Sequence, residues 1–253
     1  MKHAQIARTR LAASGLTDRP FRSADEVVRR HLAMQSQDYG PAKWSIGQRS
    51  GGLIDADVDA ALADGSIIRT HVLRPTWHFV ARDDARWLLT LSGPRVQKLL
   101  APRHRELGLD PRTLSRCEKV IAGALKDHHM TRKELGRVLK GKRIDIDGQR
   151  LPHILSHCEL EMVVCSGALA GKQHTYALFD ERVGTGGRSF DRAEAIVELN
   201  HLERHLFIGS PWVRSAQGFR QGRRLSCLGP AGLLPGLRLR AWTSTSLPSS
   251  RIS

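Results

Sequence analysis

Residues 67–81 read IIRTHVLRPTWHFVA. On either side of Arg74-Pro75 this stretch is rich in β-branched and aromatic residues, which favour an extended chain. We therefore predict two short β-strands, at residues 67–73 and 76–81, separated by the proline. The type of fold then depends on the elements that precede this strand pair.

Two amphipathic segments precede the strand pair and predict helices. The first runs from Ser23, a candidate N-cap, to about Gln35, because its apolar residues recur at helical spacing. We expect Gly40-Pro41 to stop any continuation. The second helix covers residues 56–64 and ends at a glycine. Helix, helix and strand pair in this order are typical of a winged helix, a compact variant of the helix-turn-helix.

The same order of elements recurs later in the chain. A connecting helical stretch at about residues 83–107 comes first, and a capping-box sequence, Thr131-Arg132-Lys133-Glu134, opens one of the later helices. The remaining predicted elements are helices at residues 113–128, at 131–139 and from about Gln149 onward, a hairpin with strands at 168–170 and 175–179, and a helix at 190–199.

We therefore predict a mainly α fold with small β-hairpins, built from tandem winged-helix units and ending in an irregular C-terminal tail. Residues 1–107 form the first winged-helix unit with its connecting helices, and residues 108–189 form the second. Residues 190–253 begin a third unit and then continue as a basic tail that is either disordered or out of frame.

The tail accounts for much of the charge. The chain carries a net charge of +15, and residues 200–253 hold eight arginines and a single acid, Glu203. The remaining +8 belongs to residues 1–199 and predicts a polyanionic partner, most simply nucleic acid.

The composition of the tail also suggests a frameshift. A sudden change to Arg, Ser, Pro and Gly is what a frameshift in GC-rich coding sequence produces. Resequencing that finds the reading frame intact would refute this hypothesis.

Other function classes receive no support from the sequence. The cysteines, at 117, 158, 165 and 227, form no Cys-x-x-Cys pair, so we expect buried thiols, no metal site and no cofactor. No apolar run approaches the ~18 residues that a membrane span needs, and the N-terminus lacks a signal-peptide pattern. We expect a cytoplasmic monomer that binds no membrane.

Two short motifs carry a family resemblance. Residues 34–37 read MQSQ, and Thr76-Trp77-His78 begins the second predicted strand. In order and spacing, these motifs resemble those of the bacterial winged-helix DNA glycosylases of the AlkZ and YcaQ type, over about residues 4–199. The resemblance implies tandem winged helices and a C-terminal β-rich region around double-stranded DNA. It also implies N7-alkylated purines as substrates and, in some members, interstrand crosslinks.

The resemblance implies functional residues as well. The family's Gln-x-Gln motif falls on Gln35 and Gln37, which we predict to be catalytic. Its Thr-x-His motif falls on Thr76 and His78, which we predict to contact DNA near the lesion. Ser36 departs from the more usual apolar residue between the glutamines, and the sequence after residue 199 does not look like the family's third winged helix or C-terminal barrel.

Uncharged side chains suit this chemistry. An N7-alkylguanine is cationic, so it leaves as a neutral base without being protonated. What remains is to orient a water and to stabilise positive charge on the sugar. A glutamine carbonyl can accept a hydrogen bond from that water, although it cannot take its proton as a base. We also predict phosphate contacts from five basic residues: Lys43, Arg69, Arg74, Arg132 and Lys133.

Simpler interpretations stay open. Polar residues at a helix end are usually just solvated, and a strand histidine such as His78 is most often satisfied by a neighbour. A non-catalytic winged-helix DNA-binding protein or transcription regulator is the main alternative, and a degraded reading frame without selected activity is another. Glu159 and Glu161 would repel phosphates, so we expect their helix to be structural, which argues against a sequence-specific regulator.

Overall fold

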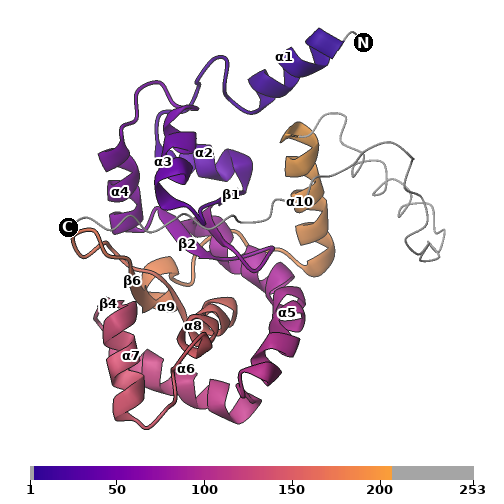
Figure 1. Ribbon diagram of the computed structural model, residues 1–253. Helices are drawn as coiled ribbons and strands as arrows, with labels where there is room; N and C mark the ends of the chain where they lie inside the picture. The colour runs from indigo at the N-terminus through magenta and orange to yellow at the C-terminus, as the bar shows by residue number, and fades with distance from the viewer. Residues whose placement is uncertain (1–2, 207–253) are drawn as a thin grey trace, which may run out of the picture. The chain divides into compact units, whose positions relative to one another are not determined.

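The computed structural model describes residues 3–206, which are mostly helical with two small antiparallel sheets (Figure 1). This confirms the predicted fold class at that level. The expectations for the tail beyond residue 206 lie outside the described residues. The elements are α1 (His3–Ala13), α2 (Ala24–His31), β1 (Ala33–Gln35), α3 (Tyr39–Gly47), α4 (Asp55–Asp64), β2 (Ile67–His71), β3 (Trp77–Ala81), α5 (Arg82–Glu106), α6 (Pro111–Leu125), β4 (Met130–Thr131), α7 (Arg132–Gly141), α8 (Arg150–Leu160), β5 (Val164–Ser166), β6 (Thr175–Leu178), α9 (Phe179–Val183) and α10 (Arg192–Leu206).

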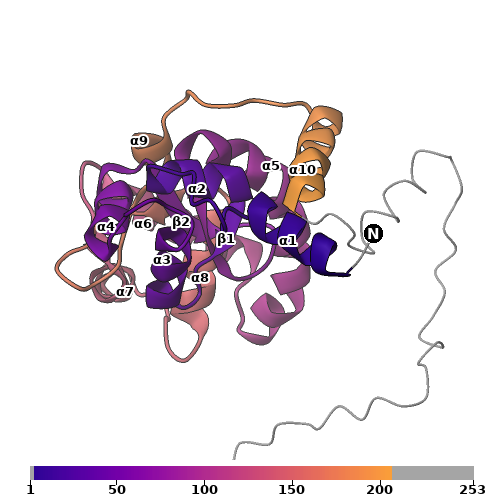
Figure 2. The same cartoon turned by 90° about the horizontal axis from the view of Figure 1, so that it is seen from above.

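One order of elements occurs twice. Residues 24–81, the first module, contain helix, strand, helix, helix, strand and strand, and residues 111–178, the second module, repeat this order. The sheets are also alike, with strand orders β1-β3-β2 and β4-β6-β5. The long helix α5 leads from the first module to the second (Figure 1), and α10 packs beside α5 and α1 (Figure 2).

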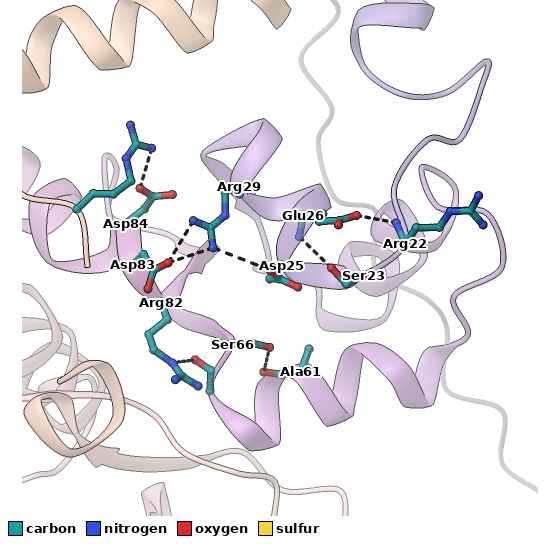
Figure 3. Close-up of polar contacts among 12 residues, drawn as sticks. Arg22, Ser23, Asp25, Glu26, Arg29, Ala61, Ser66, Arg82, Asp83 and Asp84 are labelled. Atoms are coloured by element: carbon teal, nitrogen blue, oxygen red, sulfur yellow. Dashed lines mark hydrogen bonds and ion pairs between the residues drawn. The ribbon is translucent and has the colours of Figure 1, made fainter. Parts of the chain in front are cut away.

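The first module corrects the predicted end of the first helix. Ser23 is the N-cap as predicted, because its side chain accepts a hydrogen bond from the main chain of Glu26 (Figure 3). The helix ends at His31 rather than Gln35, since Leu32 has a φ of +64° and the chain then turns into β1. β1 pairs antiparallel with β3, so the sheet has a third strand that the sequence did not predict.

Gly40-Pro41 also behaves differently from the prediction. Both residues lie in the first turn of α3, so they begin a helix rather than block one. Proline is tolerated there because main-chain N–H groups in the first turn have no partner within the helix. The second predicted helix, α4, starts one residue early at Asp55 and ends before Gly65, whose φ of +78° suits a residue without a side chain.

The helices of the second module occur close to their predicted positions, although α6 ends at Leu125 rather than at residue 128 and the strand β4 was not predicted. The capping box is confirmed: Thr131 Oγ1 accepts from the Glu134 main chain, and the Glu134 carboxylate accepts from the Thr131 main chain. The first hairpin strand, however, is Val164–Ser166 rather than residues 168–170. Met162, with a φ of +57°, turns the chain out of α8 early, so the strand begins before the predicted position.

Three apolar clusters form the core. One lies inside each module, and the third gathers around α5, where Trp87, Leu88 and Val96 meet Cys165 and Phe179 from beyond α8. Polar contacts hold the start of α5 in place, because Arg29 of α2 pairs with Asp83 at 3.1 Å and Arg82 donates to the Gly65 carbonyl at 2.7 Å (Figure 3). Helix α5 therefore joins the modules through its core cluster, and β2 also contacts β5 and α8 directly.

A histidine cluster between α5 and α8 predicts a pH dependence of stability. His104 is buried, its Nε2 has no hydrogen-bond partner, and its ring lies 5.4 Å from that of His153 and 6.1 Å from that of His157. Burial, together with the neighbouring imidazoles of His153 and His157, lowers the pKa of His104 to about 4. In the unfolded chain the pKa of a histidine is ~6.5. Between this pH and the folded-state pKa of about 4, only the unfolded state gains the proton.

We therefore expect the free energy of unfolding to decrease from pH 6.5 to pH 4, by about 1.4 kcal/mol for each unit of depressed pKa. In His104→Leu this decrease should be shallower, because the variant has one fewer group that protonates only on unfolding. Urea unfolding at several pH values in this range measures both slopes. Parallel curves for the two proteins would contradict the assignment to His104.

Candidate functional site: a cavity between the two modules

Hydrogen bonds to β3 hold the two glutamines in an extended chain. Gln35 is the last residue of β1 and lies opposite His78 in the sheet. The pairing continues beyond the strand, since the Ser36 N–H donates to the Trp77 carbonyl at 2.8 Å. The Trp77 N–H in turn donates to the Gln37 side-chain oxygen at 3.4 Å. The motif therefore lies at the edge of the sheet, with both glutamine side chains exposed.

A cavity of about 640 Å³ lies between the two modules and contains one of these glutamines. The first module contributes four side chains and the second module the rest. The lining residues are Gln37, Tyr39, Arg69, Trp77, Thr131, Arg132, Lys133, Leu151, Glu159, Ser166, Lys172, Gln173, His174, Thr175 and Tyr176. The cavity thus brings together Gln37, Arg69, Arg132 and Lys133 of the predicted site. Gln35, Lys43, Arg74, Thr76 and His78 are not among the lining residues.

Arg69 is the most confined cation of the cavity. Its residue is 8% exposed, and its Nε and Nη2 donate to the Ser36 carbonyl at 3.2 and 2.9 Å. The guanidinium stacks on the Trp77 ring, 4.4 Å from its centroid, while Arg132 approaches the same ring at 5.7 Å. Burial lowers the pKa of Arg69 below its ordinary value, and the negative charge of Glu159 offsets part of this decrease. With Lys133 and Lys172 nearby, the wall offers several positive groups to an anionic ligand.

Lys43 is not available as a phosphate contact. The lysine is buried, and its Nζ lies 2.6 Å from a carboxylate oxygen of Asp55 and 2.9 Å from one of Asp59. Tyr39 donates to the same Asp59 carboxylate at 2.5 Å. Because two carboxylates neutralise this ammonium group, the structure does not support the predicted role in binding DNA. Lys43 instead ties α3 to α4.

The Thr-x-His pair is divided between the surface and the sheet. His78 is buried in the central strand, and its Nδ1 lies 2.9 Å from the Thr76 carbonyl. Burial lowers the pKa of His78 to about 4, so this ring is neutral near pH 7. The structure therefore does not support a direct DNA contact from His78. Thr76 is half-buried and its hydroxyl has no partner, while Arg74 is exposed in the turn between β2 and β3.

Glu159 is the main residue of this cavity that the sequence interpretation missed. The sequence predicted only that Glu159 repels phosphates from a structural helix, whereas the residue is 1% exposed and lines the cavity. Its carboxylate accepts hydrogen bonds from His71 and Trp77 of the first module. The available signal was its position, because Glu159 follows Leu155 and Cys158 on the buried side of α8.

Cys117, Cys158 and Cys165 are buried free thiols, and Cys227 lies outside the described part of the chain. Between residues 3 and 206 no group of histidine, cysteine or carboxylate side chains is placed to hold a metal ion. Over the same range, no helix is long and apolar enough to cross a membrane.

Comparisons with known proteins point to one family. The family model described as DNA glycosylase AlkZ-like matches residues 28–206. The interstrand DNA cross-link repair glycosylase of Streptomyces sahachiroi is 27% identical over 179 residues, which cover 69% of this chain and 48% of that protein. The structure of Streptomyces sahachiroi DNA glycosylase AlkZ resembles this one with a TM-score of 0.68 at 24% identity, covering 81% of this chain and 57% of the other. The chain thus spans about half the length of the relative it matches.

Proposed function

The chain belongs to the AlkZ-like DNA glycosylase family, and from this premise we propose that it hydrolyses the N-glycosidic bond of N7-alkylated purines in duplex DNA. The observation that carries the proposal is the position of Gln37. It is exposed, hydrogen-bonded to β3, and placed in a cavity whose wall carries Arg69, Arg132 and Lys133. The name of the Streptomyces relative extends the proposed substrates to interstrand cross-links.

The proposed reaction needs few catalytic groups from the protein. The cationic purine is a good leaving group, so the site needs only to orient a water and to tolerate positive charge on the sugar. Gln37 is the proposed acceptor for that water, because an amide oxygen has two lone pairs and the Trp77 N–H uses only one. Gln35 precedes Gln37 by two residues and is the register partner of His78 in the sheet. We propose that it assists in orienting the water from outside the cavity.

We propose that both modules contribute to the DNA-binding surface. We interpret each module as a winged helix, within units that cover residues 1–107 and 108–189, and residues 190–206 as the start of a third. Arg69, Arg132 and Lys133 are proposed to bind phosphate oxygens at the cavity, and the exposed Arg74 is proposed to do so outside the cavity lining. Stacking on Trp77 holds the guanidinium of Arg69 in one place before DNA arrives.

Base release tests the proposal directly. The protein is incubated with duplex DNA that contains a single N7-methylguanine, and the free base is quantified by mass spectrometry. Release above the uncatalysed rate is expected from this duplex and not from a matched duplex with hypoxanthine, which is neutral and leaves poorly. No release from the first duplex, together with salt-dependent DNA binding, would favour the non-catalytic DNA-binding alternative instead.

A phosphate contact at the cavity predicts a specific salt dependence. Lys133→Ala should reduce the slope of log K against log salt concentration by about 1, because one fewer phosphate is neutralised. Lys119→Ala is the matched control, since Lys119 is also an exposed lysine of the second module but does not line the cavity. Fluorescence anisotropy between 50 and 200 mM salt, roughly the range in which such contacts change affinity, measures both slopes. Equal slopes for the two variants would remove Lys133 from the interface.

A further inference from the structure

Glu159 is a buried carboxylate that connects the two modules. It lies on α8 of the second module, and its hydrogen-bond partners, His71 and Trp77, lie in the first. One oxygen, Oε2, accepts from the His71 main-chain N–H at 2.8 Å and lies 2.5 Å from the ring nitrogen Nδ1 of His71. The other, Oε1, accepts from the indole N–H of Trp77 at 3.2 Å. Both oxygens of this carboxylate are therefore used.

The two residues held by Glu159 face each other in the sheet. His71 of β2 is the register partner of Trp77 of β3, and their rings pack with centroids 4.8 Å apart. Trp77 also holds the glutamine motif by main-chain hydrogen bonds, since its carbonyl accepts from the Ser36 N–H and its own N–H donates to the Gln37 side chain. A continuous series of hydrogen bonds thus runs from Glu159 through Trp77 to Gln37.

We propose that Glu159 is a positioning residue for the glycosylase reaction: from the second module it fixes Trp77, and through the main chain of Trp77 it sets the position of Gln37 in the cavity. This inference rests on the proposed function. It assigns Glu159 no contact with DNA. A shift of about 1 Å in a reacting group can cost 10²-fold in rate, so such positioning is expected to be measurable.

The chemistry of the contacts requires a carboxylate at this position. An ionised carboxylate only accepts, and the groups that face Glu159 are the main-chain N–H of His71, its ring nitrogen, and the indole N–H of Trp77. Glutamine has nearly the same shape but replaces one oxygen with an NH₂ group. In Glu159→Gln that NH₂ must face either the His71 N–H or the Trp77 N–H, donor against donor, so one of the two residues is released.

The experiment compares two Glu→Gln variants of the full chain. Glu159→Gln tests the proposal, and Glu118→Gln is the matched control. Glu118 likewise bonds a histidine of its surroundings, His157 Nε2 at 2.7 Å, and packs against the same helix α8, but it does not line the cavity. Trp77→Phe is a second test variant, because it removes the indole N–H from which Glu159 accepts, while a smaller aromatic ring remains beneath Arg69. Single-turnover kinetics at saturating protein give the rate of base release. A separate titration with protein gives the Kd for DNA.

We expect Glu159→Gln to release N7-methylguanine roughly 10-fold to 100-fold more slowly with Kd changed less than about twofold. Glu118→Gln should match the wild type. Trp77→Phe should also be slower, and the loss in the double variant should be smaller than the product of the two single losses, since both residues belong to the same hydrogen-bonded contact. Equal rates in Glu159→Gln and the wild type, or a loss that appears only in Kd, would overturn the proposal.

A second readout separates this proposal from the proposed function. Hydrogen exchange of the peptide that contains Ser36 and Gln37 reports the Ser36-to-Trp77 hydrogen bond without any DNA. Faster exchange there in Glu159→Gln, and not in Glu118→Gln, is expected even if the wild type proves to release no base. In that case the proposed reaction would fail while the positioning role stands. Unchanged exchange would refute the positioning role whatever the activity.

Discussion

Replacement of Gln37 by alanine is expected to slow the release of N7-methylguanine about 100-fold or more, because it removes the proposed acceptor for the attacking water. The side chain is exposed and makes one long hydrogen bond, to the Trp77 N–H at 3.4 Å. Its loss should therefore change the free energy of unfolding by no more than about 0.5 kcal/mol. DNA affinity should also be nearly unchanged, since the proposed phosphate contacts come from other residues.

Two further glutamine variants make this result specific. Gln48→Ala is the matched control: Gln48 caps the C-terminal end of α3 in the same module and does not line the cavity, so its rate of base release should equal that of the wild type. Gln35→Ala should lose less activity than Gln37→Ala, because Gln35 lies outside the cavity lining. Burst kinetics on the same duplex measures all three. Full activity in Gln37→Ala would remove this residue from the mechanism.

Elements defined by local signals were predictable from the sequence. The capping box at Thr131 and Glu134 needs only residues within one helical turn, and it is present with both hydrogen bonds. Ser23 caps α2 for the same reason. Gly65 ends α4 where a φ of +78° requires it. Each of these features depends on neighbours in the chain, so no knowledge of the tertiary fold was needed.

Elements defined by distant partners were not predictable. The segment Ala33–Gln35 continues the apolar spacing of α2, and only its pairing with β3, more than forty residues later, makes it a strand. The early start of β5 is similar, since Val164 pairs with Leu178 across the hairpin. Short strands carry little propensity of their own, and their partners decide their positions.

The candidate site shows the same division. The order and spacing of the glutamine motif led to Gln37, which the fold places in the cavity. Lys43 carries a charge that sequence reasoning counts as available, but Asp55 and Asp59 lie twelve and sixteen residues away and neutralise it. The contacts of Glu159 were not predictable from the sequence, because its donors, His71 and Trp77, belong to the other module. Charge counts alone cannot identify the partner of a buried ion.

Phe79→Ala is expected to cause the largest loss of stability, about 3–5 kcal/mol. Phe79 is 0% exposed and lies on the central strand of the first sheet, between Met34 and Arg69 in the register. Its ring meets the edge of Tyr39, with centroids 5.8 Å apart. The substitution leaves a void below the strand that carries Trp77 and beside a tyrosine of the cavity wall. Since a domain of this kind is stable by only about 5–15 kcal/mol, much of the margin would be lost.

Urea unfolding measures this effect, with Leu99→Ala as the control. Leu99 lies on α5 and is 59% exposed, so its truncation should cost no more than about 0.5 kcal/mol. If Phe79→Ala costs as little as Leu99→Ala, then β3 does not pack as described, and the register that carries Gln37 would be in doubt as well. The stability of one buried ring thus tests the same strand on which the proposed chemistry depends, by a measurement that needs no substrate.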